Sequence, residues 1–262
     1  ITHYIGIKTD VTEKRRAEES RRELEIAKQI QLSLLPDKPL CAPHAEIAGV
    51  CLPATHVGGD YFDYFENGGN LDFVVADVSG HSVGAALIMT EVRSMVRAQS
   101  RPPAVAHPAH MLRELNELLY DDLDRSELFI TMFFCRYESA TGRLKYANAG
   151  HNPGLLLRAG QQDCMELDSD GLVLGAERVV DFEERSLFLS QGDKLLFYTD
   201  GVVEAQDASG AFFGLERLCR RFAANREYAP EIIVRKLLRE ARDFCAPAVM
   251  VDDAALVVLE VS

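Results

Sequence analysis

Four short apolar segments, spread over most of the chain, each meet a turn at an aspartate. They contain Gly58-Gly59-Asp60, Asp77-Val78-Ser79-Gly80, Thr199-Asp200-Gly201 and Asp252-Asp253. Two carboxylates about 4 Å apart repel by roughly 4 kcal/mol at an effective dielectric near 20. A fold that collects such groups therefore needs raised pKa values or a divalent cation. Oxygen ligands without a matching His or Cys set point to Mg²⁺ or Mn²⁺, so the pattern predicts a two-metal phosphohydrolase.

Apolar runs separated by turn residues recur after the Pro-rich break at Pro36–Pro43. Predicted strands cover 45–53, 61–65, 71–77, 128–137, 143–148, 154–158, 184–189, 193–199 and 254–261, and predicted helices cover 82–99, 108–123, 214–224 and 230–245. Asn67-Gly68-Gly69-Asn70 and Ala140-Thr141-Gly142 have the composition of hairpin links. Because strands come in groups with helices between the groups, we expect an α+β layered fold with antiparallel sheets, not a doubly wound parallel one.

Composition narrows the class of protein further. The 262 residues are 47% hydrophobic, enough for a sizeable core, and no run approaches the roughly 20 apolar residues of a membrane span. The formal net charge of −13 disfavours binding to a nucleic-acid backbone, which relies on clustered Lys and Arg. The chain begins at Ile1 instead of Met, which suggests a piece of a longer protein. We expect no nucleic-acid partner and no membrane contact in this fragment.

The cysteines are widely spaced and contain no CxxC pair. They are Cys41, Cys51, Cys135, Cys164, Cys219 and Cys245. This pattern is typical of reduced, mostly buried thiols in a cytoplasmic protein, and it disfavours a zinc site or a disulfide framework. We therefore expect a cytoplasmic location.

The stretch from Val11 to Leu35 lacks Gly and Pro and is rich in Glu, Arg, Lys, Ala and Leu. It predicts one long helix with Asp10 or Thr12 as the N-cap. Positions spaced alternately three and four apart are Ala17, Ser20, Leu24, Ala27, Gln31 and Leu34. Such a seam suggests a weak parallel coiled coil, and hence a homodimer through residues 10–35. The alternative is a lone amphipathic helix that packs on its own domain.

Each aspartate segment, taken alone, has a plain structural interpretation. The strand that ends at Asp77 is followed by Gly80, Gly84 and an Ala-rich helix, so this aspartate could simply form a turn. The small residues also let the backbone approach a ligand, which would allow the Val78 carbonyl to face a cation. Asp-Gly turns are common, but four such segments together are far more specific than any one of them.

Longer motifs around these aspartates resemble one known family. The matching stretches are Ala27-Lys28-Gln29-Ile30-Gln31-Leu32-Ser33-Leu34-Leu35-Pro36, Val57-Gly58-Gly59-Asp60-Tyr61-Phe62-Asp63, Asp77-Val78-Ser79-Gly80-His81, Tyr146-Ala147-Asn148-Ala149-Gly150-His151-Asn152-Pro153, Phe197-Tyr198-Thr199-Asp200-Gly201-Val202-Val203-Glu204 and Asp252-Asp253-Ala254. In this order, over about residues 27–260, the chain resembles the PPM (PP2C-like) metal-dependent serine/threonine phosphatases of the bacterial SpoIIE/RsbU branch.

The resemblance implies an α-β-β-α sandwich, two antiparallel sheets flanked by helices, with two Mn²⁺ or Mg²⁺ ions at one edge. It assigns metal ligation to Asp60, Asp77, the Val78 carbonyl, Asp200 and Asp252, with Asp253 as second choice because the register of the pair is ambiguous. Asp77 and Asp60 would hold a metal-activated water that attacks phosphoserine or phosphothreonine, so no protein nucleophile is needed.

Two positions depart from the family pattern. Animal members carry a histidine two residues beyond the bridging aspartate, where this chain has Ser79; His81 lies four residues beyond. A histidine proton donor is therefore in doubt. Ser82 replaces a glycine found in many bacterial relatives and restricts the turn before the helix. His151 is interpreted as a structural residue that fixes a hairpin by hydrogen bonding.

The first residues resemble the last strand of a PAS sensor domain. The expected organisation is a PAS tail at 1–9, a coiled-coil linker at 10–36 and a phosphatase domain at 37–262. By family analogy alone, the substrate is a phosphorylated bacterial signalling protein, most plausibly an anti-anti-sigma factor with a STAS domain, and an upstream sensor regulates the enzyme through the linker. The alternatives are a catalytically weak scaffold that binds a partner protein and, less favoured, a two-metal nuclease.

Overall fold

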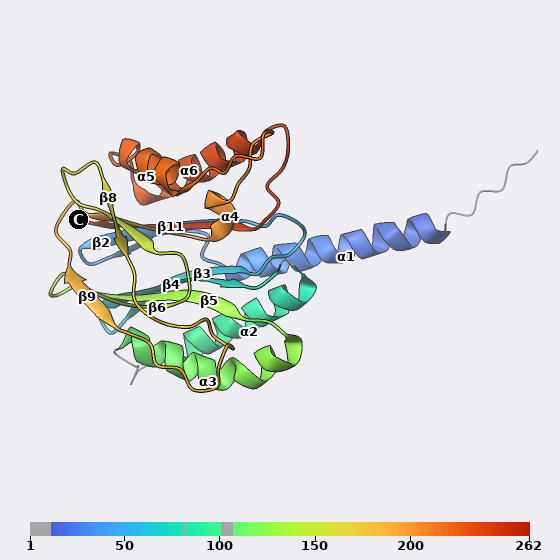
Figure 1. Ribbon diagram of the computed structural model, residues 1–262, viewed down its shortest axis with the longest axis horizontal. Coiled ribbons are helices and arrows are strands. Elements are labelled where there is room, and N and C mark those ends of the chain that lie inside the picture. The colour runs from blue at the N-terminus through green and yellow to red at the C-terminus, as the bar shows by residue number, and fades with distance from the viewer. Residues whose placement is uncertain (1–11, 81, 101–106) are drawn as a thin grey trace, which may run out of the picture.

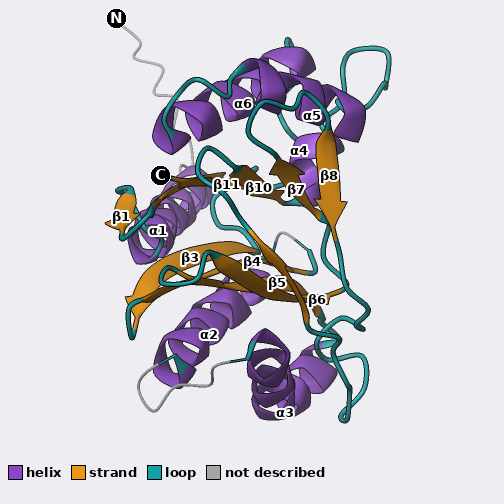
Figure 2. Cartoon of the chain, turned by 90° about the vertical axis from the view of Figure 1, so that its left-hand side faces the viewer, coloured by secondary structure: helices purple, strands orange, loops and turns teal. Residues whose placement is uncertain are grey.

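The computed structural model describes residues 12–80, 82–100 and 107–262. Four layers are stacked in the order helices, sheet, sheet, helices (Figure 1, Figure 2). Helices α5 (Leu215–Ala224) and α6 (Pro230–Cys245) cover one sheet, while α2 (Val83–Gln99) and α3 (Pro108–Ser126) cover the other. The predicted α+β sandwich is confirmed.

The first sheet has six strands in the order β1-β2-β11-β10-β7-β8, all antiparallel neighbours. Their bounds are β1 (Leu40–Ala42), β2 (Ala45–Leu52), β11 (Ala254–Val261), β10 (Lys194–Tyr198), β7 (Gly154–Leu157) and β8 (Cys164–Leu167). The central strand β11 is buried over most of its length, as expected for an apolar run covered on both faces. Its first residues therefore have a fixed position at one end of the sheet.

The second sheet has five strands in the order β3-β4-β5-β6-β9, again antiparallel throughout. Their bounds are β3 (Asp60–Asn67), β4 (Asn70–Val78), β5 (Ile130–Glu138), β6 (Arg143–Ala149) and β9 (Arg185–Phe188). The predicted hairpin links are confirmed, since Asn67 pairs with Asn70 and Glu138 with Arg143. Gly68 and Gly69 have φ values of 59° and 83°, as a tight two-residue turn requires.

The core between the sheets is rich in aromatic residues. Phe197 of β10 packs against Phe73 of β4 and Phe133 of β5, with ring centroids 5.3 and 5.0 Å apart. All three side chains are at most 1% exposed. Buried aromatic pairs of this kind hold the two sheets in one register relative to each other, which matters because the predicted site draws residues from both.

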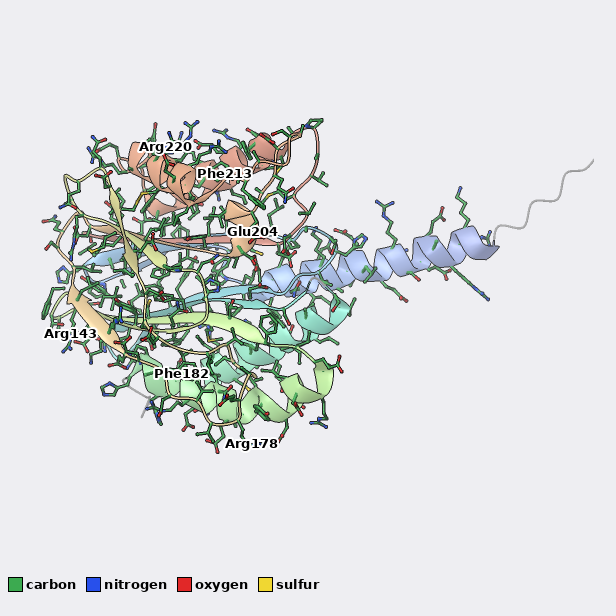
Figure 3. All side chains as sticks on the ribbon, viewed as in Figure 1. Arg143, Arg178, Phe182, Glu204, Phe213 and Arg220 are labelled. Carbon is green, nitrogen blue, oxygen red and sulfur yellow. A yellow bond between two sulfur atoms is a disulfide. The ribbon has the colours of Figure 1, made fainter. Side chains whose placement is uncertain are left out.

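Helix α1 (Thr12–Leu34) begins the described chain and projects from the body (Figure 1). Side chains on its outer half point into solvent (Figure 3), and Ala17 and Ser20 are exposed. Its last turns pack on the domain, where Gln31 is only 6% exposed. The alternative of a helix packed on its own domain therefore holds for the C-terminal half of α1, and Gln31 cannot belong to an intermolecular seam.

Several elements differ from the prediction. Strands β1 and β8 and the short helix α4 (Asp200–Val203) were not expected. The expectation that all the cysteines are reduced is wrong for two of them, because Cys164 and Cys219 form a disulfide between β8 and α5. Their separation of 55 residues gives no spacing signal, since the pair meets only when α5 packs beside the sheet. Among the described residues, no helix is long and apolar enough to cross a membrane.

Candidate metal centre

Asp60 and Asp77 lie side by side in the second sheet. Asp60 is the first residue of β3, Asp77 is near the end of β4, and the antiparallel register pairs them directly. Asp60 is 3% exposed, whereas Asp77 is partly exposed. Directly opposed residues on neighbouring strands have Cβ atoms about 4.5–5.5 Å apart, so two acidic side chains share one edge of the sheet.

The other predicted aspartates reach the same edge from the first sheet. Asp200 is the first residue of α4 and is separated from β10 by Thr199 alone, and Asp252-Asp253 directly precede β11. Because β10 and β11 are antiparallel neighbours, with Tyr198 paired to Leu256, the end of one strand meets the start of the other. The fold therefore brings together all the sequence-predicted aspartates.

Thr199 connects the two sheets at this edge. Its Oγ1 donates a hydrogen bond to Oδ2 of Asp60 at 2.7 Å and accepts one from the backbone N–H of Ala255 at 2.8 Å. The Thr199 side chain is fully buried. The hydroxyl thus fixes one Asp60 oxygen relative to the start of β11. The sequence predicted no role for Thr199, because its partner Asp60 lies 139 residues away in the chain.

Asp253 and Asp252 have different environments. Asp253 is 3% exposed, and its two carboxylate oxygens accept the backbone N–H groups of Ala54 at 2.8 Å and Gly59 at 2.9 Å. Asp252 is partly exposed, and its Oδ1 accepts the N–H of Asp253. The Asp253 carboxylate therefore braces the loop before β3, while Asp252 is the more accessible of the two.

The acidic side chains raise one another's pKa. The pKa of Asp77 is raised to about 8, chiefly by burial and then by Asp200, Asp252 and Asp253. Burial and Asp77 raise the pKa of Asp60 well above its usual value, against the lowering effect of the Thr199 hydrogen bond. Burial and Asp252 also raise the pKa of Asp200. Such mutual destabilisation of the charged forms is the condition that a bound cation relieves.

Backbone oxygens add to the donor set beside Gly59. A Cβ at this residue would lie 2.3 Å from the Val78 carbonyl oxygen, 3.1 Å from Asp77 Oδ1 and 3.2 Å from the Gly80 carbonyl oxygen. Only glycine fits against this group of oxygens, and the N–H of Val78 is bonded to the Gly59 carbonyl at 3.3 Å. The Val78 carbonyl thus lies with Asp77 in an oxygen-rich recess.

The donor set suits hard divalent cations. In the described part of the chain, no group of three or more His, Cys, Asp or Glu side chains lies close enough together to hold one metal ion. Mg²⁺ needs fewer protein ligands, because it keeps several waters and binds through one or two carboxylates. Asp60, Asp77 and the Val78 carbonyl on one sheet, with Asp200 and Asp252 on the other, fit this mode of binding.

Helix α1 holds the loop that carries Gly58 and Gly59. The Gln31 amide donates to the Gly58 carbonyl at 2.7 Å, and its Oε1 accepts the Gly58 N–H at 3.0 Å. Lys28 Nζ donates to the Thr55 carbonyl at 3.0 Å. The C-terminal end of α1 is therefore hydrogen-bonded to the segment immediately before Asp60.

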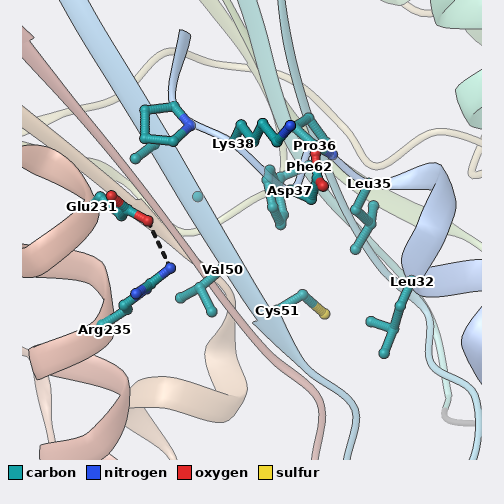
Figure 4. Close-up of a pocket in the computed structure, with 13 residues that line it drawn as sticks. Leu32, Leu35, Pro36, Asp37, Lys38, Val50, Cys51, Phe62, Glu231 and Arg235 are labelled. Carbon is teal, nitrogen blue, oxygen red and sulfur yellow. Dashed lines mark hydrogen bonds and ion pairs between the residues drawn. The ribbon is translucent and has the colours of Figure 1, made fainter.

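Residues from the end of α1, from β2 and from α6 line a cavity of about 180 Å³ (Figure 4). Leu32 and Leu35 line one side, and the ion pair between Glu231 and Arg235, at 2.6 Å, lies on the other. Cys51 lines the cavity too, and burial raises the pKa of its thiol, followed by the nearby Asp60 and Asp253. None of the aspartates of the acidic cluster (Asp60, Asp77, Asp200, Asp252 and Asp253) lines this cavity, although Asp60 and Asp253 lie near its Cys51.

The remaining candidates have structural contacts. Ser79 Oγ accepts the backbone N–H of Phe129, and Ser82 caps α2 by accepting the N–H of Ala85. His81 lies outside the described residues. His151 is buried, its Nδ1 is 2.8 Å from Thr131 Oγ1 and its Nε2 is 3.2 Å from the Tyr198 carbonyl. These contacts agree with a structural role, and burial lowers the pKa of this imidazole to about 4.

Comparisons with known proteins agree with the fold and the motifs. Residues 67–262 match the family described as Stage II sporulation protein E (SpoIIE). The chain is 31% identical to the phosphoserine phosphatase RsbU of Bacillus subtilis, over 74% of this chain and 57% of that protein. It spans about half the length of the curated relatives it matches.

Two solved structures show the same fold. The SiaA-PP2C domain of Pseudomonas aeruginosa superposes with a TM-score of 0.80 at 18% identity, covering 97% of this chain and 100% of that one. The catalytic domain of the serine/threonine protein phosphatase PstP, solved with two manganese ions, has a TM-score of 0.61 at 15% identity, covering 83% and 98%. With the PP2C-type sandwich and the family match over most of its length, the chain belongs to the Stage II sporulation protein E (SpoIIE) family.

Proposed function

We propose that this chain is a metal-dependent protein phosphatase that hydrolyses phosphoserine or phosphothreonine. The observation that carries the proposal is the convergence of Asp60, Asp77, Asp200 and Asp252 from four strand ends on one edge of the sandwich. Two relatives, RsbU and RsbP of Bacillus subtilis, are named phosphoserine phosphatases, which supports this activity.

We assign two Mn²⁺ or Mg²⁺ ions to Asp60, Asp77, the Val78 carbonyl, Asp200 and Asp252. When bound, the ions supply activation of water and neutralisation of charge on the phosphoryl group. Asp77 and Asp60 would supply carboxylate oxygens to the ions. Thr199 keeps the Asp60 carboxylate in position through its 2.7 Å hydrogen bond. The presence of two manganese ions in the PstP structure and of magnesium in that of RsbX supports the choice of metal.

Hydrolysis of p-nitrophenyl phosphate and of a phosphoserine peptide in the presence of Mn²⁺ tests the activity. We expect turnover by the wild type, loss of turnover on chelation with EDTA, and at least a 100-fold loss for Asp77→Asn. A scaffold protein, the alternative function, would bind its partner without metal and without turnover. Equal turnover by the wild type and Asp77→Asn would overturn the proposed site.

The proposed substrate is a phosphorylated STAS-domain protein, an anti-anti-sigma factor. Relatedness to RsbU and RsbP supports this class of substrate. The formal net charge of −13 favours a protein partner over nucleic acid. Release of phosphate from a phosphorylated STAS domain, measured against the same domain with a threonine phosphate in a different loop, tests this specificity.

We also propose that residues 1–9 end a PAS sensor, that residues 10–36 form a dimeric linker, and that residues 37–262 are the phosphatase domain. Residues 1–9 lie outside the described residues. The contacts of Gln31 and Lys28 with the loop before Asp60 support control by the linker. Ile26 and Ile30, 50% and 59% exposed on α1, would contribute to a dimer. A double change to Asn should lower the molar mass measured by light scattering to that of a monomer; an unchanged mass excludes this dimer contact.

A further inference from the structure

A pocket of about 360 Å³ opens beside the acidic cluster, between the end of β2 and the end of α6. Its lining is mostly apolar: Leu52, Pro53, Ala54, Ala246, Ala248, Val249 and Met250, with Arg242 and Asp243 at the rim. The rim charges are of opposite sign, so they give the pocket little net charge. A pocket of this composition selects an occupant by apolar contact.

The segment that joins α6 to β11 presents apolar side chains to solvent. Val249 and Val251 are 77% and 73% exposed, whereas Met250 between them is 6% exposed and belongs to the core beneath α5 and α6. The buried Met250 anchors the segment, and the two valines on either side of it remain exposed. Single exposed apolar residues are ordinary, but here two of them adjoin an apolar pocket.

The pocket is continuous with the proposed metal centre. Ala54 lines the pocket, and its backbone N–H donates to Asp253 Oδ1 at 2.8 Å. Met250 precedes Asp252 by two residues, and an extended chain advances by at most about 3.3–3.6 Å per residue. Its Cα therefore lies within about 7 Å of the Cα of Asp252. Figure 1 shows this segment running to β11 along the edge from which α1 projects.

We infer that this pocket binds an apolar side chain of the phosphoprotein substrate, located two or three residues from the phosphoserine. The inference rests on the proposed phosphatase activity. A peptide with its phosphate at the acidic cluster reaches the pocket with two or three extended residues. Burial of a Leu or Ile side chain there, against Val249 and Ala248, would favour the bound peptide and set sequence preference around the phosphorylated residue.

A library of phosphoserine peptides, with Leu moved through the three positions on each side of the phosphoserine in a Gly/Ser background, tests the pocket. With Mn²⁺ present, we expect Leu at one position two or three residues away to raise kcat/KM about tenfold or more. Val249→Asp and Ala248→Glu should remove that preference. Neither changes turnover of p-nitrophenyl phosphate, which is too small to reach the pocket.

Val179→Ser is the matched control, because Val179 is 85% exposed and lies in the segment between β8 and β9; it should keep the full preference. The pocket proposal is wrong if the wild type shows no preferred Leu position, or if the preference survives in both pocket variants. Turnover of p-nitrophenyl phosphate in the same experiments would still support the phosphatase proposal. Absence of turnover on every substrate, p-nitrophenyl phosphate included, overturns the phosphatase proposal and the pocket with it.

Discussion

The Thr199 hydroxyl donates a hydrogen bond to Oδ2 of Asp60 across the junction of the two sheets, at 2.7 Å. Thr199 Oγ1 also accepts a hydrogen bond from the backbone N–H of Ala255, which belongs to β11. One buried hydroxyl therefore links the first residue of β3 to the strand that follows Asp252-Asp253. The relative position of the two halves of the proposed metal centre depends on this link.

Thr199→Val should weaken metal binding and destabilise the protein. Valine keeps the shape of threonine but leaves the Ala255 N–H without its acceptor and removes a hydrogen bond that lowers the pKa of Asp60. We expect a loss of about 1–3 kcal/mol in unfolding free energy and at least a tenfold weaker Mn²⁺ affinity by titration calorimetry. Thr199→Ser, which keeps the hydroxyl, is the control; equal effects of the two substitutions would exclude the hydrogen bond as the cause.

The metal-free protein should lose stability as the pH rises from 6.5 to 8. Asp77 has a pKa of about 8 in the folded state against 3.8 as its ordinary value, so the folded state binds more protons than the unfolded state in this window. For one such group the unfolding free energy falls by up to about 1.4 kcal/mol per pH unit. Urea denaturation in EDTA measures this slope, and Asp77→Asn should flatten it.

The pH window begins at 6.5 because, below that pH, the titration of His151 changes the unfolding free energy in the opposite direction. His151 has a folded pKa of about 4 against 6.5 as its ordinary value, so its burial as the neutral form makes stability rise with pH between these values and adds nothing above them. Mn²⁺ affinity should increase with pH through the same range in which the metal-free protein weakens, because the ligands must be deprotonated to bind. A pH-independent affinity would contradict the raised pKa of Asp77.

Gln31→Leu tests the contact between helix α1 and the loop before Asp60. Leucine removes both hydrogen bonds to Gly58 and leaves a buried N–H and C=O without partners, which costs about 1–3 kcal/mol each. We expect a lower melting temperature and reduced phosphatase activity. Gln29→Leu is the matched control, because Gln29 is exposed on the same helix. Equal losses from the two changes would mean that the Gly58 contact is not what matters.

Gly59→Ala should weaken metal binding at the proposed site around Asp77 and Val78. The added Cβ would lie 2.3 Å from the Val78 carbonyl oxygen, and a backbone atom cannot move aside as the end of a side chain can. We expect at least a tenfold loss of Mn²⁺ affinity and of kcat/KM. At Gly84 in α2 the nearest atom to an added Cβ is Ser82 Oγ, at 3.3 Å. Gly84→Ala should therefore keep activity and gain up to about 1 kcal/mol of helix stability.

The sequence predicted the parts of this fold that depend on local pattern. The predicted strands at 71–77 and 193–199 correspond to β4 and β10, and the Gly68-Gly69 turn set the register that pairs Asp60 with Asp77. The features that the sequence did not predict depend on contacts between distant segments. No local signal distinguishes the bracing role of Asp253, the link through Thr199 or the pairing of Cys164 with Cys219, because each partner comes from more than 50 residues away.

Gln31 illustrates the same limit within one helix. Its spacing relative to Leu24 and Leu34 suits a coiled-coil seam, and the same spacing suits a face that packs on the domain. Only the position of the Gly58 backbone decides between them, since it offers a donor and an acceptor matched to the Gln31 amide. Of the predicted seam, Ala17 and Ser20 are exposed and Gln31 is buried, and periodicity did not predict the partner of Gln31.

Separate substitutions of Asp252 and Asp253 by Asn should show which aspartate binds the metal and which stabilises the loop before β3. Asp253→Asn replaces one of the two oxygens that accept the Ala54 and Gly59 N–H groups with an NH₂ donor, which should cost about 1–3 kcal/mol of unfolding free energy. Asp252→Asn keeps an acceptor for the Asp253 N–H and removes a charge that raises the pKa of Asp77 and Asp200. The metal-free Asp252→Asn protein should therefore be as stable as the wild type or more so.

For Mn²⁺ affinity we expect the opposite order, with the larger loss in the Asp252 variant. We expect Asp252→Asn to weaken Mn²⁺ affinity and kcat/KM by at least tenfold, because it removes a ligand charge at the accessible carboxylate. Asp253→Asn should keep measurable Mn²⁺ binding at temperatures below its lowered melting point. Denaturation in EDTA and Mn²⁺ titration on both variants give the comparison. If Asp253→Asn were fully stable yet unable to bind Mn²⁺, the register of the pair would be reversed, and Asp253 would be the ligand that β11 presents to the metal centre.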